Sequence, residues 1–245
     1  DPDTYLQKSE IDSFFTASGK KFATKDGTRP FAHRLIVSTT DKWSKHAEDA
    51  LADQVTPVSR LWFKDLANSP VDWGALDLTK PDTLRLKARH ETRPHQDEAI
   101  DNSISGFKTS DRGKLIMACG TGKTFTSLRL AERQTPKTGR ILFLAPSISL
   151  VAQTLREWTA HAHEPFHAFV VCSDTKVGNE EEDLKTHDLA YPATTDHKAI
   201  AASAKLLTKN RRTVVFSTYQ SIQVVADAQK LGLGEFDLLS RPYEV

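Results

Sequence analysis

The chain has few sulfur-containing residues and almost no excess of charge. Its 245 residues include two cysteines, Cys119 and Cys172, whose separation excludes a disulfide framework and suits a reducing compartment. Lysine and arginine total 33 against 32 acidic residues, so any surface for nucleic acid must be local. No apolar run approaches the roughly 18 residues of a membrane helix, and no signal peptide is present. We therefore expect a soluble, cytoplasmic protein that does not contact a membrane.

Methionine is scarcer still. The single methionine is Met117, and the chain does not begin with one. We therefore expect the sequence to be a fragment or a processed product. Its length allows one large or two small domains, each able to bury a core.

Residues 1–67 have the pattern of a small αβ domain. Ile11, Phe14 and Phe15 fall at i, i+3 and i+4, which indicates one apolar face of a helix. The lysine-rich segment 19–30 is predicted to be a loop. The remaining pattern predicts a strand at 34–38, a helix at 43–51 and a strand at 58–63.

Residues 68–92 are rich in proline, aspartate and turn-forming residues, which is typical of a linker. From residue 93 to 245, predicted strands and helices alternate, which favours a parallel sheet with helices on both faces. The polar segment 174–195 is predicted to be a surface loop. The predicted strands span 114–117, 141–145, 167–172, 213–217 and 235–239, and the predicted helices span 95–107, 124–133, 148–161, 196–208 and 219–230.

Residues 117–124 read MACGTGKT, between the predicted buried strand 114–117 and the predicted helix 124–133. A glycine-rich turn there points backbone N–H groups and the positive end of a helix at one spot, which suits phosphate. Gly120 and Gly122 would let the backbone approach the anion closely. Lys123 would reach the β and γ phosphates, and the Thr124 hydroxyl would hold Mg²⁺. Met117 stands where the usual G-x-x-x-x-G-K-[ST] pattern has its first glycine.

Three further segments narrow the class of phosphate-binding protein: RPHQDEAI at 93–100, FLAPSISLVAQ at 143–153 and VVFSTYQSI at 214–222. Together with the phosphate loop, they resemble the first RecA-like lobe of superfamily 2 helicases and translocases. The resemblance is to the branch that restriction enzymes carry, and it covers about residues 90 to 239.

The resemblance implies ATP and Mg²⁺ as ligands, with Gly120, Thr121, Gly122, Lys123 and Thr124 around the phosphates. It also implies that Gln96 reads the edge of adenine with Arg93 beside it, although a glutamine at this point could equally cap a helix. The segments expected to hold the DNA backbone are Ala145, Pro146 and Ser147, and Ser217, Thr218 and Tyr219. These could alternatively be ordinary turn residues of an αβ fold.

The resemblance fails at one place. The strand that begins Phe236-Asp237-Leu238 should lead into an Asp-Glu-Ala-His type box, but Pro242 and Tyr243 occupy the places of the two acids. Those acids would hold Mg²⁺ through water and orient the attacking water. We therefore find no complete catalytic set, and expect the chain to bind nucleotide weakly without hydrolysing it.

The amino-terminal segments 11–19, 34–40 and 43–50 resemble the closing half of an Mrr-like restriction endonuclease domain. The catalytic residues of that family lie upstream of this pattern and match no residue here. The triplets Asp174 with Lys176 and Asp183 with Lys185 are set aside, because metal-dependent cleavage needs carboxylates on a rigid strand.

Two clusters of side chains could be binding sites, but we interpret both as structural. His161, His163 and His167 lack the further ligands that a zinc site needs, so we interpret them as a solvated helix end. The cations of a basic cluster could contact a phosphate backbone. We slightly favour the alternative, in which they lie at the carboxyl end of a helix, where positive charge is stabilising. This cluster consists of Lys205, Lys209, Arg211 and Arg212.

The sequence therefore predicts the ATP-binding lobe of a restriction-associated DNA helicase or translocase that is coupled to an endonuclease domain. Its expected partners are DNA, a second RecA-like lobe and the upstream half of the nuclease. The alternative is a nucleotide-gated DNA-binding or scaffold domain without motor activity. A small-molecule phosphotransferase is a weaker alternative, because the two DNA-side segments argue against it.

Overall fold

The computed structural model describes residues 3–25, 27–52, 54–173, 189, 191–207 and 210–240. The chain divides into two compact units. One contains residues 1–69 and 173–193, and the other contains residues 70–172 and 194–245. Within the described ranges, no helix has the length and apolar character needed to span a membrane.

The first unit is a small αβ structure whose elements follow the predicted order. Its strands β3 and β4 pair in parallel, from Arg34 opposite Val58 to Val37 opposite Leu61. Parallel strands need a crossover, and a helix supplies it here. The elements are α1 (Lys8–Ser18), β3 (Arg34–Val37), α2 (Lys45–Leu51), β4 (Val58–Leu61) and α3 (Phe63–Ala67).

The segment 19–30 differs from its prediction as a loop. It contains an antiparallel hairpin of β1 (Phe22–Thr24) and β2 (Gly27–Arg29). Phe22 packs against Phe31, with ring centroids 4.6 Å apart. Strands of three residues are too short to show an alternation in sequence, so the pattern could not reveal them.

The core of the first unit contains a buried cation. The Arg60 side chain on β4 is 3% exposed and pairs with Glu48 on α2 at 2.7 Å. Its guanidinium lies 4.7 Å from the Trp43 ring centroid and 3.6 Å from that of Trp62. A buried charge needs such partners, so Arg60 fastens β4 to α2. The apolar core around it is formed by Ile11, Ile36, Trp43, Ala47, Leu51, Val58 and Trp62.

The second unit is built on a four-stranded sheet in the order β6-β7-β5-β8, and every neighbouring pair is parallel. This confirms the predicted αβ class with a parallel sheet. The strands are β5 (Arg140–Ala145), β6 (His167–Val171), β7 (Thr213–Thr218) and β8 (Leu238–Ser240).

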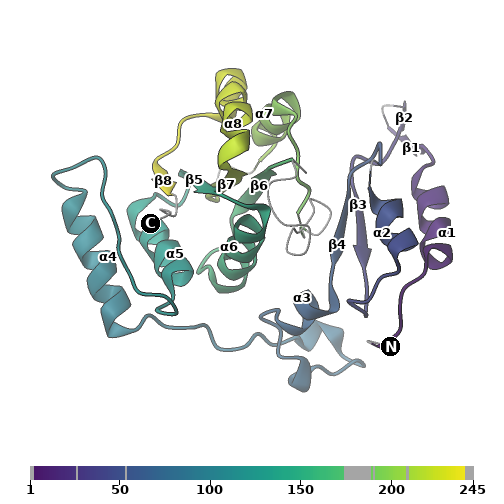
Figure 1. Ribbon diagram of the computed structural model, residues 1–245, viewed down its shortest axis with the longest axis horizontal. Coiled ribbons are helices and arrows are strands. Elements are labelled where there is room, and N and C mark those ends of the chain that lie inside the picture. Colours follow the sequence, from purple (N-terminus) through teal and green to yellow (C-terminus); the bar gives the residue numbers. More distant parts are fainter. Residues whose placement is uncertain are drawn as a thin grey trace. The chain divides into compact units, whose positions relative to one another are not determined.

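Helices cover both faces of this sheet. On one face, Trp158 of α6 (Ile148–His161) packs against Phe143 and Phe216, with ring centroids 5.7 and 5.6 Å away. On the other face, Leu142 and Val215 join the core formed with α7 (His197–Lys205) and α8 (Ile222–Ala228). Figure 1 shows α7 and α8 on the side of the strands opposite α6. This double covering explains why β5 and β7 each contain an uninterrupted apolar run, at 141–145 and 214–216.

The other helices of the second unit lie close to their predicted positions. They are α4 (Pro94–Gly106) and α5 (Lys123–Gln134). The predicted helix 219–230 begins as a 3-10 turn, η4 (Tyr219–Ser221), and continues past α8 as a π-helical turn, η5 (Gln229–Leu233). Gly232 has a φ of 112° in that turn, which ends the helix.

The predicted buried strand at 114–117 is wrong. These residues have no strand assignment, Leu115 is 39% exposed and Ile116 is 88% exposed. A strand persists only where a neighbour pairs with its backbone groups, and no ladder in the described residues includes this segment. Within the described part of the chain, this apolar run therefore joins no sheet.

The expected linker 68–92 contains two 3-10 turns, η1 (Trp73–Ala75) and η2 (Pro81–Thr83). It is closed by an antiparallel bridge between Val71 and Leu86. The division between the two units falls at Ser69, near the start of this segment. Residues 174–188, which include both Asp-x-Lys triplets, and residues 241–245, which include Pro242 and Tyr243, lie outside the described residues, as does Lys209.

Candidate nucleotide-binding site

The MACGTGKT loop turns at two glycines. Gly120 has a φ of 75° and Gly122 a φ of 81°, both in the left-handed region that side chains disfavour. Gly122 is the N-cap of α5, so the twelve-residue helix begins at Lys123. The first N–H groups of α5 have no partner within their own helix, and the helix dipole adds positive potential there. The loop therefore has the backbone features of an anion site.

The side chains of the loop fold back onto its own carbonyl groups. Lys123 Nζ donates to the carbonyl oxygens of Met117 at 3.4 Å and of Ala118 at 3.2 Å. Thr121 Oγ1 donates to the same Ala118 oxygen at 2.7 Å. Carbonyl partners at these distances exert only a weak hold on an exposed ammonium group, so Lys123 can exchange them for a phosphate.

The first turn of α4 joins the loop directly. Gln96 is 4% exposed, accepts from the Arg93 backbone N–H at 2.9 Å and donates to the Thr121 carbonyl at 2.9 Å. The capping role left open in the sequence is thus present. Arg93, the residue before α4, is exposed. The structure therefore brings Arg93, Gln96 and residues 120–124 together.

Thr124 lies in the first turn of α5 and is half-buried. Its carbonyl accepts from Trp158 Nε1 at 3.1 Å, which ties the start of α5 to α6. Among the described residues, no group of three or more His, Cys, Asp or Glu side chains could hold a metal ion. At this loop, the Thr124 hydroxyl is an oxygen group of the kind that magnesium ions accept as a ligand.

The two predicted DNA-side segments meet at one edge of the sheet, because Ala145 at the end of β5 pairs with Thr218 at the end of β7. Ser147 caps α6 by accepting from the Leu150 N–H at 3.3 Å. Ser217 is buried and donates to the Thr218 carbonyl at 3.0 Å. Thr218 is 5% exposed, and its hydroxyl bonds to Ser221 at 3.2 Å. These hydroxyls therefore shape the turns, while Pro146, Ser147 and Tyr219 are partly accessible.

The chain matches two known families. Residues 89–239 match the family described as type III restriction enzyme, res subunit. The chain belongs to this family. Residues 1–83 match a family described as restriction endonuclease, so the res-subunit region follows a nuclease-type region.

Two solved structures of type ISP restriction-modification enzymes are similar to the chain. The DNA-bound ATP-dependent restriction-modification enzyme LlaBIII is 37% identical with a TM-score of 0.81, over 97% of this chain and 15% of that one. A nuclease-deletion mutant of LlaGI, in complex with a DNA substrate mimic, is 40% identical with a TM-score of 0.53, over 62% of this chain and 15% of that one. UvrABC system protein B of Kosmotoga olearia is 40% identical over 77 residues, 31% of this chain and 11% of the relative. The chain thus spans a small part of each relative.

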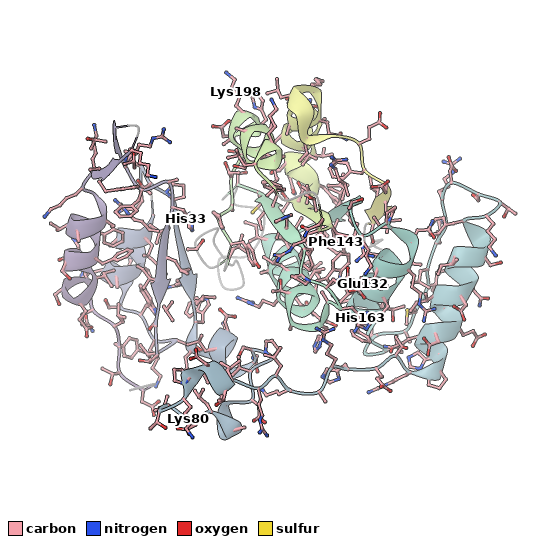
Figure 2. The ribbon with its side chains drawn as sticks, turned by 180° about the vertical axis from the view of Figure 1, so that it is seen from behind. His33, Lys80, Glu132, Phe143, His163 and Lys198 are labelled. Carbon is pink, nitrogen blue, oxygen red and sulfur yellow. The ribbon has the colours of Figure 1, made fainter. Side chains whose placement is uncertain are left out.

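The res-subunit region also contains a charged cleft that the sequence did not predict. The cleft has a volume of about 720 Å³. Arg129 lies at its centre, with a side chain 5% exposed, and pairs with Glu132 at 2.6 Å. Figure 2 labels Glu132 and His163, which lie close together; His163 Nδ1 is 2.9 Å from Glu132 Oε2. The lining includes Ala88, Arg89, His90, Glu91, Thr92, Arg129, Glu132, Arg133, Lys137, His163, Glu164 and Arg212.

Contacts between residues that line the cleft join the segment before α4 to α5 and to the carboxyl end of α6. Arg129 donates to the carbonyls of His161 at 3.0 Å and His90 at 3.4 Å. The His90 and His161 rings meet edge to face at 4.6 Å. Burial, together with the charges of His90 and Arg129, holds the pKa of His161 below its ordinary value. These contacts of Arg129, and that of His163 with Glu132, join residues 31 to 39 positions apart, which leaves no local signal, so only the folded chain reveals them.

The structure changes the interpretation of two residues, His163 and Arg212. His163 pairs with Glu132 and has a structural partner, so it is more than a solvated helix end. Arg212 does meet a helix end, as expected of the basic cluster, but the end belongs to α5. Its guanidinium donates to the carbonyls of Glu132 at 2.8 Å and Thr135 at 3.1 Å.

Proposed function

We propose that the chain is the nucleotide-binding lobe of a restriction-associated DNA helicase or translocase, joined to part of a nuclease domain. The observation that carries the proposal is the phosphate loop, with Gly120 and Gly122 at positive φ and Lys123 opening α5. A structural turn has no need of two left-handed glycines beside an exposed lysine, whereas a phosphate site does.

ATP is the proposed ligand. Lys123 would leave the carbonyls of Met117 and Ala118 for the β and γ phosphates, and residues 120–124 would donate backbone N–H groups. Thr124 would share a magnesium ion with the phosphates, and the ion would neutralise phosphate charge. Adenine would lie near Arg93 and Gln96.

DNA is the proposed partner, because the type ISP relatives are described in complex with DNA or a substrate mimic. We assign backbone contacts to the ends of β5 and β7, from Ala145, Pro146 and Ser147, and from Ser217, Thr218 and Tyr219. The buried Ser217 and Thr218 hydroxyls would hold the turn, so the accessible Ser147 and Tyr219 would make the direct contacts. In the parent protein, a second RecA-like lobe and the upstream nuclease half would complete the enzyme.

The two cysteines provide a test of nucleotide binding. Cys119 is exposed within the phosphate loop, whereas Cys172 is buried and 2% exposed. We expect Mg²⁺·ATP to slow the reaction of Cys119 with a maleimide by at least about fivefold, because the bound phosphates would cover the loop. Mass spectrometry of the labelled 245-residue chain measures each cysteine separately, and Cys172 serves as the internal control.

The matched control is Lys123→Ala. This variant keeps both cysteines and the glycines but removes the charge that holds the phosphates, so ATP should protect its Cys119 no more than buffer does. Equal protection in both proteins, or none in the unchanged chain, contradicts the proposal.

A binding domain without motor activity is the second candidate, favoured by Pro242 and Tyr243 at the places of the two acids. We expect the 245-residue chain to release phosphate from ATP no faster with duplex DNA than without it, because no carboxylate would orient the attacking water. A steady-state phosphate-release assay measures this. Robust turnover stimulated by DNA, and abolished by Lys123→Ala, would show that another group replaces the acids.

A further inference from the structure

The side-chain amide of Gln96 is bonded to the phosphate loop itself. Its nitrogen donates to the Thr121 carbonyl at 2.9 Å, and its oxygen accepts from the Arg93 N–H at 2.9 Å. The amide thus bridges the start of α4 and the loop, 25 residues later in the chain. The side chain is almost wholly buried, so this contact is shielded from competing water.

The contact between Gln96 and the loop is also steric. A Cβ atom at Gly122 would lie 2.5 Å from Gln96 Nε2. Only a glycine permits this approach, and its φ of 81° sets the direction in which α5 begins. Gln96 therefore lies against the residue at which the loop becomes a helix.

His95 supplies a second contact to the same atom. Its Nε2 lies 3.3 Å from the Thr121 carbonyl oxygen. A carbonyl oxygen can only accept, so His95 Nε2 carries the hydrogen in this contact. Two consecutive side chains of α4 thus donate to one carbonyl of the loop, and neither contact involves a nucleobase.

We propose that the first turn of α4 is a brace for the phosphate loop, in which His95 and Gln96 are positioning residues. This inference rests on the proposed nucleotide site. The C=O and N–H groups of a trans peptide point in opposite directions, and the described chain contains no cis peptide. The Thr121 carbonyl and the Gly122 N–H belong to the same peptide. Because α4 holds the carbonyl, the N–H points away from α4 and is available to donate to an anion. The brace acts on phosphate whatever base the ligand carries.

The brace is compatible with adenine recognition by Gln96. A glutamine amide has two N–H donors and an oxygen with two lone pairs. The brace and the cap together use one donor and one lone pair. The two functions predict different effects on affinity, however. Inorganic tripolyphosphate has no base, so only loss of the brace would weaken its binding, whereas loss of adenine recognition would weaken the binding of ATP alone.

Titration calorimetry at pH 8 with Mg²⁺ separates the two functions in the 245-residue chain. We expect Gln96→Met to weaken tripolyphosphate by about tenfold and ATP by at least as much, because the Thr121 carbonyl loses its shorter hydrogen bond in both cases. His95→Phe should weaken both by about threefold, and His95→Gln, which keeps a donor, should restore the affinity.

His95→Phe is the decisive variant because His95 is exposed and neither caps α4 nor matches the adenine-reading position. Glu98→Gln, an exposed change on the same helix, is the matched control and should change neither affinity. Unchanged tripolyphosphate affinity in His95→Phe, or a loss confined to ATP in Gln96→Met, would overturn the brace. If the unchanged chain binds neither ligand, or if Lys123→Ala does not weaken the binding, the proposed nucleotide site is contradicted. The brace, which depends on that site, is then contradicted as well.

Discussion

Gly122→Ala should lower the affinity for Mg²⁺·ATP by about 100-fold. The new Cβ would meet Gln96 Nε2 at 2.5 Å, and the φ of 81° disfavours any side chain. The left-handed conformation alone costs roughly 1–2 kcal/mol, and displacing the buried Gln96 amide costs about 1–3 kcal/mol more. The bound state requires both the loop shape and the start of α5, so these costs fall on binding. Cys119 protection or calorimetry measures the change.

Two other glycines serve as graded controls. Gly120 shares the positive φ, at 75°, but a Cβ there meets nothing within 4 Å, so Gly120→Ala should cost only about tenfold. Gly113 has neither constraint, so Gly113→Ala should bind ATP like the unchanged chain. Equal effects at positions 120 and 122 would show that the contact with Gln96 is unimportant.

Gln96→Ala combined with Gly122→Ala should lower the affinity for ATP by less than the two single changes added together, because the shorter side chain at position 96 removes the clash.

Arg129→Met should destabilise the second unit by about 3–5 kcal/mol, the second large effect that we expect. The change removes the guanidinium partner of Glu132, whose side chain is only 10% exposed, and leaves the His161 carbonyl without its guanidinium donor. It also removes the packing of the guanidinium over the Phe125 ring, 4.6 Å from the centroid. Hydrogen exchange in peptides from α5 and α6 measures the loss in the elements that Arg129 joins.

Arg133→Met, one turn further along α5, is the matched control. Its side chain is 45% exposed and pairs with Asp97 and Asp101 at 3.4 and 2.9 Å. Exposed pairs of this kind contribute about 0–1 kcal/mol, because water screens them. If the two variants are equally stable, Arg129 does not anchor the cleft. Adding Glu132→Leu to Arg129→Met should recover part of the lost stability, since no buried charge then remains unpaired.

The helices and the paired strands of the second unit were predictable because each carries a local period or a continuous apolar run. Trp158 and Leu155 fall on one face of α6, and β5 and β7 contain uninterrupted apolar runs at 141–145 and 214–216. The glycine-lysine-threonine loop was also predictable, because its residues are consecutive. The segment 114–117 has the same apolar character and yet forms no strand, since a strand depends on a neighbour that no local pattern specifies.

The sequence by itself determined the alternation of helices and strands, the loop that fits phosphate and the family to which the chain belongs. These features depend on residues within one or two turns of one another, where spacing alone sets the geometry. Only the tertiary structure decided that Gln96 and His95 meet Thr121, that Arg129 anchors His90 and His161, and that Arg60 lies between two tryptophans. Most of these contacts join residues well separated along the chain, and their formation depends on the packing of whole elements around a shared core.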